Sequence, residues 1–261
     1  MISAKIIKDS IYNGNRLTTL ELEYPRYIHS EFMTHRMFSR NAQSSRAIPI
    51  ETMIRNIETN PVIPIFMKNK KGMFADEYTD GITLPESIDI WIDARNAAIL
   101  HARKLIELGV HKQIVNRLLE PFSHIKVIVS ATDWDNFFNL RISLNAQQEI
   151  CELATKIKVA MDLSEPTRLY LGEWHIPYLD LTEYELDMPH RKMLGVARCA
   201  RVSYLNHDRF IDHEKDYELH DRLLEDRHMS PFEHVSTPSV TNVRLSNFKG
   251  WTQYRYRIEN I

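Results

Sequence analysis

The chain has 261 residues, of which 43% are hydrophobic and 26% charged, and its formal net charge is -2 with a pI of about 6.6. This composition is typical of a globular protein with a sizeable core, and it lacks the basic excess of a nucleic-acid-binding protein. No apolar run approaches the roughly 18 residues of a membrane span, so we expect a cytoplasmic protein with no membrane partner.

The first half of the chain predicts a β-hairpin followed by helices. Apolar and polar residues alternate on both sides of Asn13-Gly14, which indicates two strands joined by a tight turn. The interval 60–85 is rich in Pro, Gly, Lys and Met and is interpreted as a long loop that acts as a lid. The predicted strands are 2–7 and 16–23, and the predicted helices are 27–38, 51–59, 87–108 and 110–119.

The second half predicts one buried strand and further helices. Residues 125–131 are rich in β-branched types, as in a buried strand. Cys151 and Cys199 form no CxxC pair, which suggests a reducing compartment, and no GxGxxG follows a strand, which argues against a Rossmann site. The remaining predictions are helices at 133–140, 146–161 and 213–225, an irregular segment at 169–181, a loop at 227–234 and a final strand and helix ending at 261.

The stretch 34–46 is the most polar candidate site. It holds three arginines, one histidine, three serines and one asparagine, and burying so many polar groups is costly unless each finds a partner. Guanidinium groups and short hydroxyls close together suit a phosphorylated small molecule. A solvated loop or helix end would explain the same composition.

The spacing within 34–46 resembles the signature of the flavin-dependent thymidylate synthases, the ThyX family. That signature reads Arg-His-Arg, then seven residues, then Ser. The first Arg is replaced here by Thr34. The positions that fall in register are His35, Arg36, Ser39, Asn41, Ser44 and Arg46.

Region 116–150 resembles a second landmark of the family. Arg117 lies shortly before Pro121, and the motif Asn-Phe-x-x-Leu-Arg runs from Asn136 to Arg141. Ala-Gln-x-Glu-Ile follows at 146–150. A polar helix end followed by an ordinary amphipathic helix would also account for this pattern.

The tail, 198–261, resembles the opening third of ThyX chains. It contains Ala-Arg-Val-Ser-Tyr at 200–204, Lys-Asp at 215–216 and His-Met-Ser-Pro-Phe-Glu-His at 228–234. In the family these precede the signature, whereas here they follow it, so the order is that of a circular permutation. Residues 251–255 resemble the first part of the signature as well, but only 34–46 continues into the full pattern.

The resemblance implies a single catalytic domain over 1–261, with a ThyX-like α+β fold in which a mixed or antiparallel sheet is flanked by helices. It implies reductive methylation of dUMP to dTMP with FAD as cofactor and methylenetetrahydrofolate and NADPH as co-substrates. It also implies a homo-oligomer, a tetramer, with shared sites. No cysteine lies in a landmark, so an attacking thiolate is not indicated.

The family's roles carry over residue by residue. Arg141 is the expected catalytic residue, because a guanidinium beside the pyrimidine would stabilise negative charge that develops on the ring. No metal site is expected. The expected substrate-binding residues are Glu31, Gln43, Ser44, Ser45, Arg46, Arg117 and Arg141. The expected cofactor-binding residues are Thr34, His35, Arg36, Ser39, Asn41, Asn136, Asn145, His228 and Ser230.

Two other functions remain open at this point. Glu31, Thr34 and Ala42 depart from the family pattern near the expected substrate, which leaves room for a related enzyme that transfers a hydroxymethyl group or acts on another pyrimidine nucleotide. A non-catalytic nucleotide-binding protein is the alternative from another class. The retained Arg117 and Arg141 argue against that alternative.

Overall fold

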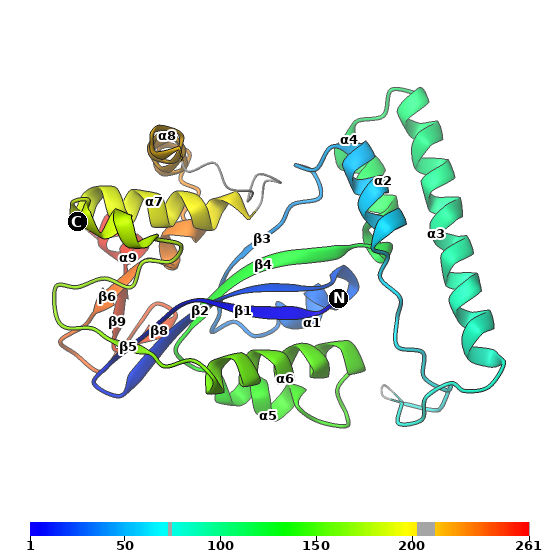
Figure 1. Ribbon diagram of the computed structural model, residues 1–261, viewed down its shortest axis with the longest axis horizontal. Helices are drawn as coiled ribbons and strands as arrows, with labels where there is room; N and C mark the ends of the chain where they lie inside the picture. The colour runs from blue at the N-terminus through cyan, green and yellow to red at the C-terminus, as the bar shows by residue number, and fades with distance from the viewer. Residues whose placement is uncertain (73–74, 203–211, 261) are drawn as a thin grey trace.

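The computed structural model of the protein describes residues 1–72, 75–202 and 212–260. Within these ranges the main sheet has five strands in the order β3-β4-β2-β1-β5, where β1 and β5 are parallel and all other neighbours antiparallel. Helices lie on both sides of this sheet (Figure 1). The expected α+β class, with a mixed sheet flanked by helices, is confirmed.

The predicted hairpin forms the centre of the sheet. Strands β1 (Ser3–Tyr12) and β2 (Asn15–Pro25) pair antiparallel from Ser3 opposite Glu23 to Tyr12 opposite Asn15, with one register shift between Ile6 and Lys8. Asn13 and Gly14 between them have φ angles of 45° and 76°, the left-handed conformations that an Asn-Gly turn provides. Strand β4 (His124–Ala131), predicted at 125–131, pairs with the other side of β2.

One face of the sheet packs on two predicted helices, α5 (Asp135–Arg141) and α6 (Gln148–Asp162). Leu20 and Leu22 of β2 belong to the same buried cluster as apolar residues of α6. The α6 members recur at helical spacing, which explains why this helix is readable from the sequence. They are Ile150, Leu153, Ala154, Ile157 and Met161.

The opposite face is covered by α7 (Met188–Arg201), which sequence reasoning did not predict. Its Cys199 packs with Ile128 of β4 in a small buried cluster. Local signals for this helix exist, because the Asp187 side chain accepts a hydrogen bond from the His190 N–H and a proline occupies the first turn.

Three helices form a second group beside the sheet, with α3 standing outermost (Figure 1). These are α2 (Ile50–Thr59), α3 (Thr83–Glu107) and α4 (Lys112–Val115). They share their own core, to which Ile57 and Ile99 belong. Among the residues that the structure describes, no helix combines the length and apolar character that a bilayer crossing requires.

Two helix predictions are wrong in extent. The expected helix 27–38 is only a 3-10 turn η1 (Arg26–Ile28) and a four-residue α1 (His29–Phe32). Its continuation is replaced by turns, because the Arg40 guanidinium donates to the carbonyls of Phe32, Met33 and His35 and so ends the helix. The chain then forms strand β3 (Ser39–Ala42) against β4.

The expected helix 110–119 is likewise broken. After α4 the chain continues as two 3-10 turns, η2 (Asn116–Leu118) and η3 (Glu120–Phe122). The buried Asn116 amide donates to the carbonyls of Ser45 and Ile48, a contact that fixes this turn against the signature. Local tertiary contacts therefore override helix propensity here.

The tail packs beside α7 and above one end of the sheet (Figure 1). Helix α8 (His213–Glu225) matches its predicted bounds, whereas residues 203–204 of the first tail landmark lie outside the described residues. The predicted final strand and helix are present as β9 and α9. The remaining short elements are β5 (Thr167–Arg168), η4 (Leu181–Glu185), η5 (Ser230–Glu233), β6 (Ser236–Pro238), β7 (Arg244–Leu245), β8 (Phe248–Lys249), β9 (Trp251–Gln253) and α9 (Tyr254–Glu259).

Candidate functional site

A cleft of about 570 Å³ lies at the end of β3, between the signature and the tail. Three parts of the chain that are distant in sequence form it: the stretch 40–47, the start of α4, and the tail from α7 to η5. The described lining residues are Arg40, Asn41, Ala42, Ser44, Arg46, Ala47, His111, Gln113, Ala200, Leu223, His228, Ser230 and Pro231.

The cleft unites residues that the sequence assigned from two separate landmarks. Ser44 and Arg46 come from the signature, and His228 and Ser230 come from the tail landmark. The signature ends at residue 46 and the tail landmark begins at residue 228. Their meeting in one cleft results from the packing of the tail beside the end of β3.

The lining chemistry favours an anion. The polar lining residues are arginines, histidines, serines and side-chain amides, and no carboxylate is among the lining residues that the structure describes. Arg46, His228 and Ser230 are exposed and can reach a ligand. Several donors around one space match the oxygens of a phosphate group.

Buried contacts hold the wall that the signature contributes. The Asn41 side chain donates to the Cys199 carbonyl of α7 at 3.2 Å. Asn116 donates to the Ser45 carbonyl at 2.7 Å, and the Lys112 ammonium to the Ala47 carbonyl at 3.3 Å. Ser45 is buried and is not among the lining residues, so the structure gives it a place behind the cleft rather than in it.

Arg141 lies in a second group, against the turn after α1. Its Nε donates to His35 Nε2 at 2.9 Å, and its Nη2 to Thr34 Oγ1 at 3.2 Å. The Glu31 carboxylate is 3.4 Å from its Nη1. The structure thus brings together four predicted site residues, but Arg141 is not among the residues that line the cleft.

His35 is a neutral acceptor in this group. Burial, and after it the nearby guanidinium groups of Arg141 and Arg40, lowers the pKa of His35 to about 4. The ring also packs edge-to-face on Phe137, with the ring centroids 4.8 Å apart. At neutral pH the imidazole therefore accepts a hydrogen bond from the Arg141 guanidinium.

Arg40 joins the two groups, and sequence reasoning assigned it no role. The residue lines the cleft, and its Nη1 donates to the carbonyl of His35 at 3.1 Å. His111 and Gln113 are two further lining residues that the sequence did not single out. Arg40 could have been found from its place in the polar run, whereas nothing local distinguishes His111 or Gln113.

Several predicted residues lie outside both groups. Arg117 is exposed and paired with Glu120 at 2.9 Å, and the Gln43 backbone N–H donates to the Lys126 carbonyl at 2.8 Å beyond the end of β3. The others that the structure leaves exposed on the surface are Arg36, Asn136 and Asn145.

Ser39 is buried and ties the signature to the end of the tail. Its hydroxyl accepts hydrogen bonds from Asn247 at 3.0 Å and from Gln253 at 2.9 Å. Gln253 belongs to the stretch that resembles a second copy of the signature's first part. That stretch therefore packs directly on the signature strand.

A chain of hydrogen bonds runs through the sheet beneath the tail. His175 Nε2 lies 2.8 Å from the Thr19 hydroxyl, which lies 2.6 Å from the Ser130 hydroxyl. Ser130 in turn lies 2.8 Å from Nδ1 of His234. Both histidines are fully buried, and this burial lowers the pKa of His234 to about 3 and that of His175 well below its usual value.

Comparison with known proteins gives a family match. The profile of the family described as thymidylate synthase complementing protein matches residues 17–166, which is more than half of the chain and includes 34–46 and 116–150. No sequence among curated proteins matches.

Solved structures of PolB, described as a UMP/dUMP methylase from Streptomyces cacaoi, are similar to this chain. The complex with 5-Br UMP has a TM-score of 0.47 and 14% identity, and the match covers 62% of this chain and 88% of that one. The complex with 5-Br dUMP has a TM-score of 0.46 and 15% identity, and the match covers 62% and 90%.

Proposed function

Because the chain belongs to the thymidylate synthase complementing protein family, we propose that it is a methyltransferase that converts dUMP to dTMP. The observation that carries the proposal is the cleft, in which the signature residues Ser44 and Arg46 face His228 and Ser230 of the tail. The donors around this space suit the 5′-phosphate of a nucleotide.

FAD is the proposed cofactor, because the donors that line the cleft suit it. The cleft offers hydroxyl, amide and imidazole donors with no carboxylate among its described lining residues, which fits a group that carries a pyrophosphate. Asn41, His228 and Ser230 would hold it. When bound, this group would supply the hydride that completes the methyl group, and methylenetetrahydrofolate and NADPH would serve as carbon source and reductant.

Arg141 is the proposed catalytic residue. Its guanidinium, oriented by the neutral His35 and by Thr34, carries a fixed positive charge that would stabilise negative charge developing on a pyrimidine ring. Glu31 offsets part of that charge in the free protein. A ligand that approaches Arg141 must therefore compete with this carboxylate.

A homo-oligomer, which we propose to be a tetramer, fits the separation of the two groups. Arg141 is not among the lining residues of the cleft that would hold the phosphate. In a symmetric assembly the same surfaces recur, so Arg141 of one subunit can complete the cleft of another. Sedimentation analysis of the purified protein tests this, and a monomer that still turns over would contradict it.

Product analysis by mass spectrometry tests the reaction. The protein is incubated with dUMP, methylenetetrahydrofolate, FAD and NADPH, and in parallel with UMP in place of dUMP. We expect dTMP from the dUMP reaction. A hydroxymethylated product would indicate the related one-carbon transfer instead, and bound nucleotide without any product would indicate a non-catalytic nucleotide-binding protein.

A control variant distinguishes a specific loss of dUMP binding from a general effect of removing an arginine. Arg46→Ala removes an exposed guanidinium from the cleft, whereas Arg95→Ala removes a half-buried guanidinium of α3 that lies outside the lining residues. We expect Arg46→Ala to weaken dUMP binding and Arg95→Ala to leave it unchanged. Flavin content is read from the absorbance spectrum, and a protein that binds no flavin in titration would contradict the cofactor proposal.

A further inference from the structure

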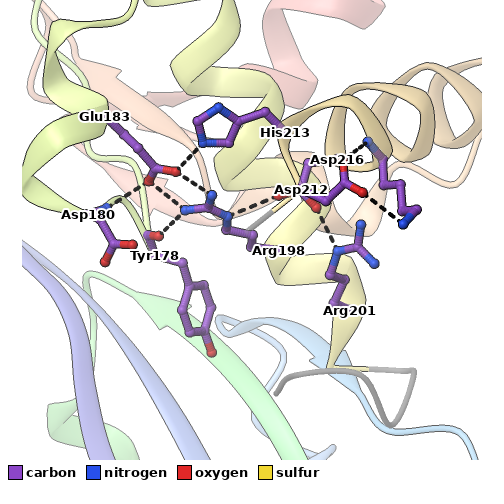
Figure 2. A network of polar contacts seen from close by, with 9 residues as sticks. Tyr178, Asp180, Glu183, Arg198, Arg201, Asp212, His213 and Asp216 are labelled. Carbon is purple, nitrogen blue, oxygen red and sulfur yellow. Dashed lines mark hydrogen bonds and ion pairs between the residues drawn. The ribbon is translucent and has the colours of Figure 1, made fainter. Parts of the chain in front are cut away.

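A buried network of charged side chains joins the two helices whose residues line the tail side of the cleft (Figure 2). Its centre is Asp216, in the first turn of α8, with a side chain only 4% exposed. One carboxylate oxygen accepts from Arg198 Nε at 3.1 Å, and the other accepts from Arg201 Nε at 2.6 Å. A single carboxylate thus connects the last turn of α7 to the first turn of α8.

The far side of the network is fixed by Glu183 of η4. Its carboxylate accepts two hydrogen bonds from Arg198, of which the one from Nη1 is 2.6 Å long. The same carboxylate accepts the Asp180 N–H at 2.8 Å and lies 2.7 Å from His213 Nε2. Figure 2 shows these contacts converging on the Glu183 carboxylate, which faces Arg198.

The charges complement both helices. The two arginines lie in the last turn of α7, where the helix dipole favours cations, and Asp216 lies in the first turn of α8, where it favours anions. Two carboxylates balance two guanidinium groups, so the cluster is neutral without a charge on His213. Removal of the Asp216 charge would leave a buried guanidinium short of a partner.

The position of this network bears directly on the cleft. Arg198 and Arg201 bracket Cys199, whose carbonyl accepts from Asn41, and Ala200, which lines the cleft. Leu223 of α8 lines it as well. The same turn of α7 therefore contacts Asp216 on one side and the signature strand on the other.

From this arrangement we infer that Asp216 is a positioning residue that sets the distance between the signature and tail walls of the cleft. It touches no ligand and acts through Arg198 and Arg201. Loss of its charge should loosen the end of α7 and let the tail wall shift relative to β3. This shift should occur in addition to any decrease in the free energy of unfolding.

The test uses Asp216→Asn with Asp9→Asn as matched control. Asp9 is equally buried, with a side chain 4% exposed, and pairs with Arg16 at 2.6 Å in the hairpin, outside the cleft lining. Nitroxide labels at His111→Cys and His228→Cys, in a Cys151→Ser background, report the separation of two lining residues by pulsed electron resonance. We expect a broadened distance distribution in Asp216→Asn and the distribution of the unsubstituted label pair in Asp9→Asn.

Nucleotide affinity gives a second readout, and only this one rests on the proposed function. We expect Asp216→Asn to bind dUMP roughly tenfold or more weakly than wild type, because small displacements of binding groups have large effects, and Asp9→Asn to bind it normally. Unchanged distances in Asp216→Asn, or equal broadening in both variants, would overturn the inference. Distances that change as expected in a protein that binds no dUMP would defeat the proposed function and leave the inference standing.

Milder variants decide the question if Asp216→Asn does not fold. Arg201→Gln and Arg16→Gln remove guanidinium groups of similar exposure, 25% and 28%, one from each ion pair. Arg201→Gln should broaden the distance distribution, and Arg16→Gln should not. The same distribution in both variants would refute the positioning role.

Discussion

Acidification should destabilise the protein through His234, and the structure gives the size of this effect. The ring is fully buried, with Nδ1 2.8 Å from the Ser130 hydroxyl, and burial lowers its pKa from 6.5 to about 3. The folded state therefore binds this proton less readily than the unfolded chain. Stability from a neutral His234 is present above pH 6.5 and is lost as the pH falls from there toward 3.

The magnitude follows from linkage. At pH 5, about 1.5 units below the ordinary histidine pKa, protonation of this one group in the unfolded chain lowers the free energy of unfolding by about 2 kcal/mol relative to neutral pH. His175, whose pKa burial also lowers, acts in the same direction. Because His234 follows directly after η5, which carries Ser230 and Pro231, loss of this contact would also affect the cleft.

Urea unfolding at pH 7 and pH 5 measures the effect. His234→Gln keeps a side chain that can bond Ser130 but has no titrating group. We expect the stability difference between the two pH values to shrink by about 2 kcal/mol in this variant. His228→Gln, which replaces an exposed histidine, serves as control and should retain the wild-type difference. An unchanged difference in His234→Gln would refute the reasoning.

Three further predictions concern activity and packing. Arg141→Ala should lower kcat by roughly 10²–10³ while flavin content is retained, as steady-state kinetics and absorbance would show, and near-normal turnover would remove its catalytic role. Arg46→Ala should raise the KM for dUMP with little change in kcat, because contacts to phosphate serve mainly ground-state binding, and an equal loss in kcat would contradict this. Gly195→Ala should destabilise the fold by roughly 1–3 kcal/mol in urea unfolding, because the added Cβ would clash with Ile176 Cγ2, and wild-type stability would show that this contact relaxes freely.

Regular periodicity and turn chemistry were sufficient to predict much of the fold. The hairpin follows from alternation around Asn13-Gly14, and α6 and α8 follow from helical spacing and end close to their expected bounds. These elements are readable because each uses one buried face of fixed period. Helix α7 was missed although its capping signals are local.

The candidate site depended on both the local sequence and the tertiary packing. The residue types and spacing in 34–46 indicated a phosphate-binding stretch and the family, which the match over 17–166 supports. That residues 39–42 of this stretch form a strand was decided by tertiary contacts, because the Arg40 guanidinium ends α1 and β4 offers a partner for 39–42.

Only the tertiary structure could assemble the cleft and separate Arg141 from it. His111, Ala200 and Ser230 meet at one cleft because the hairpin, the helical group and the tail pack around the end of β3. No local pattern records which distant segments will become neighbours, since such contacts depend on the packing of whole elements. The sequence therefore determined which chemistry the chain carries, and the packing of its elements decided which of those groups share one space.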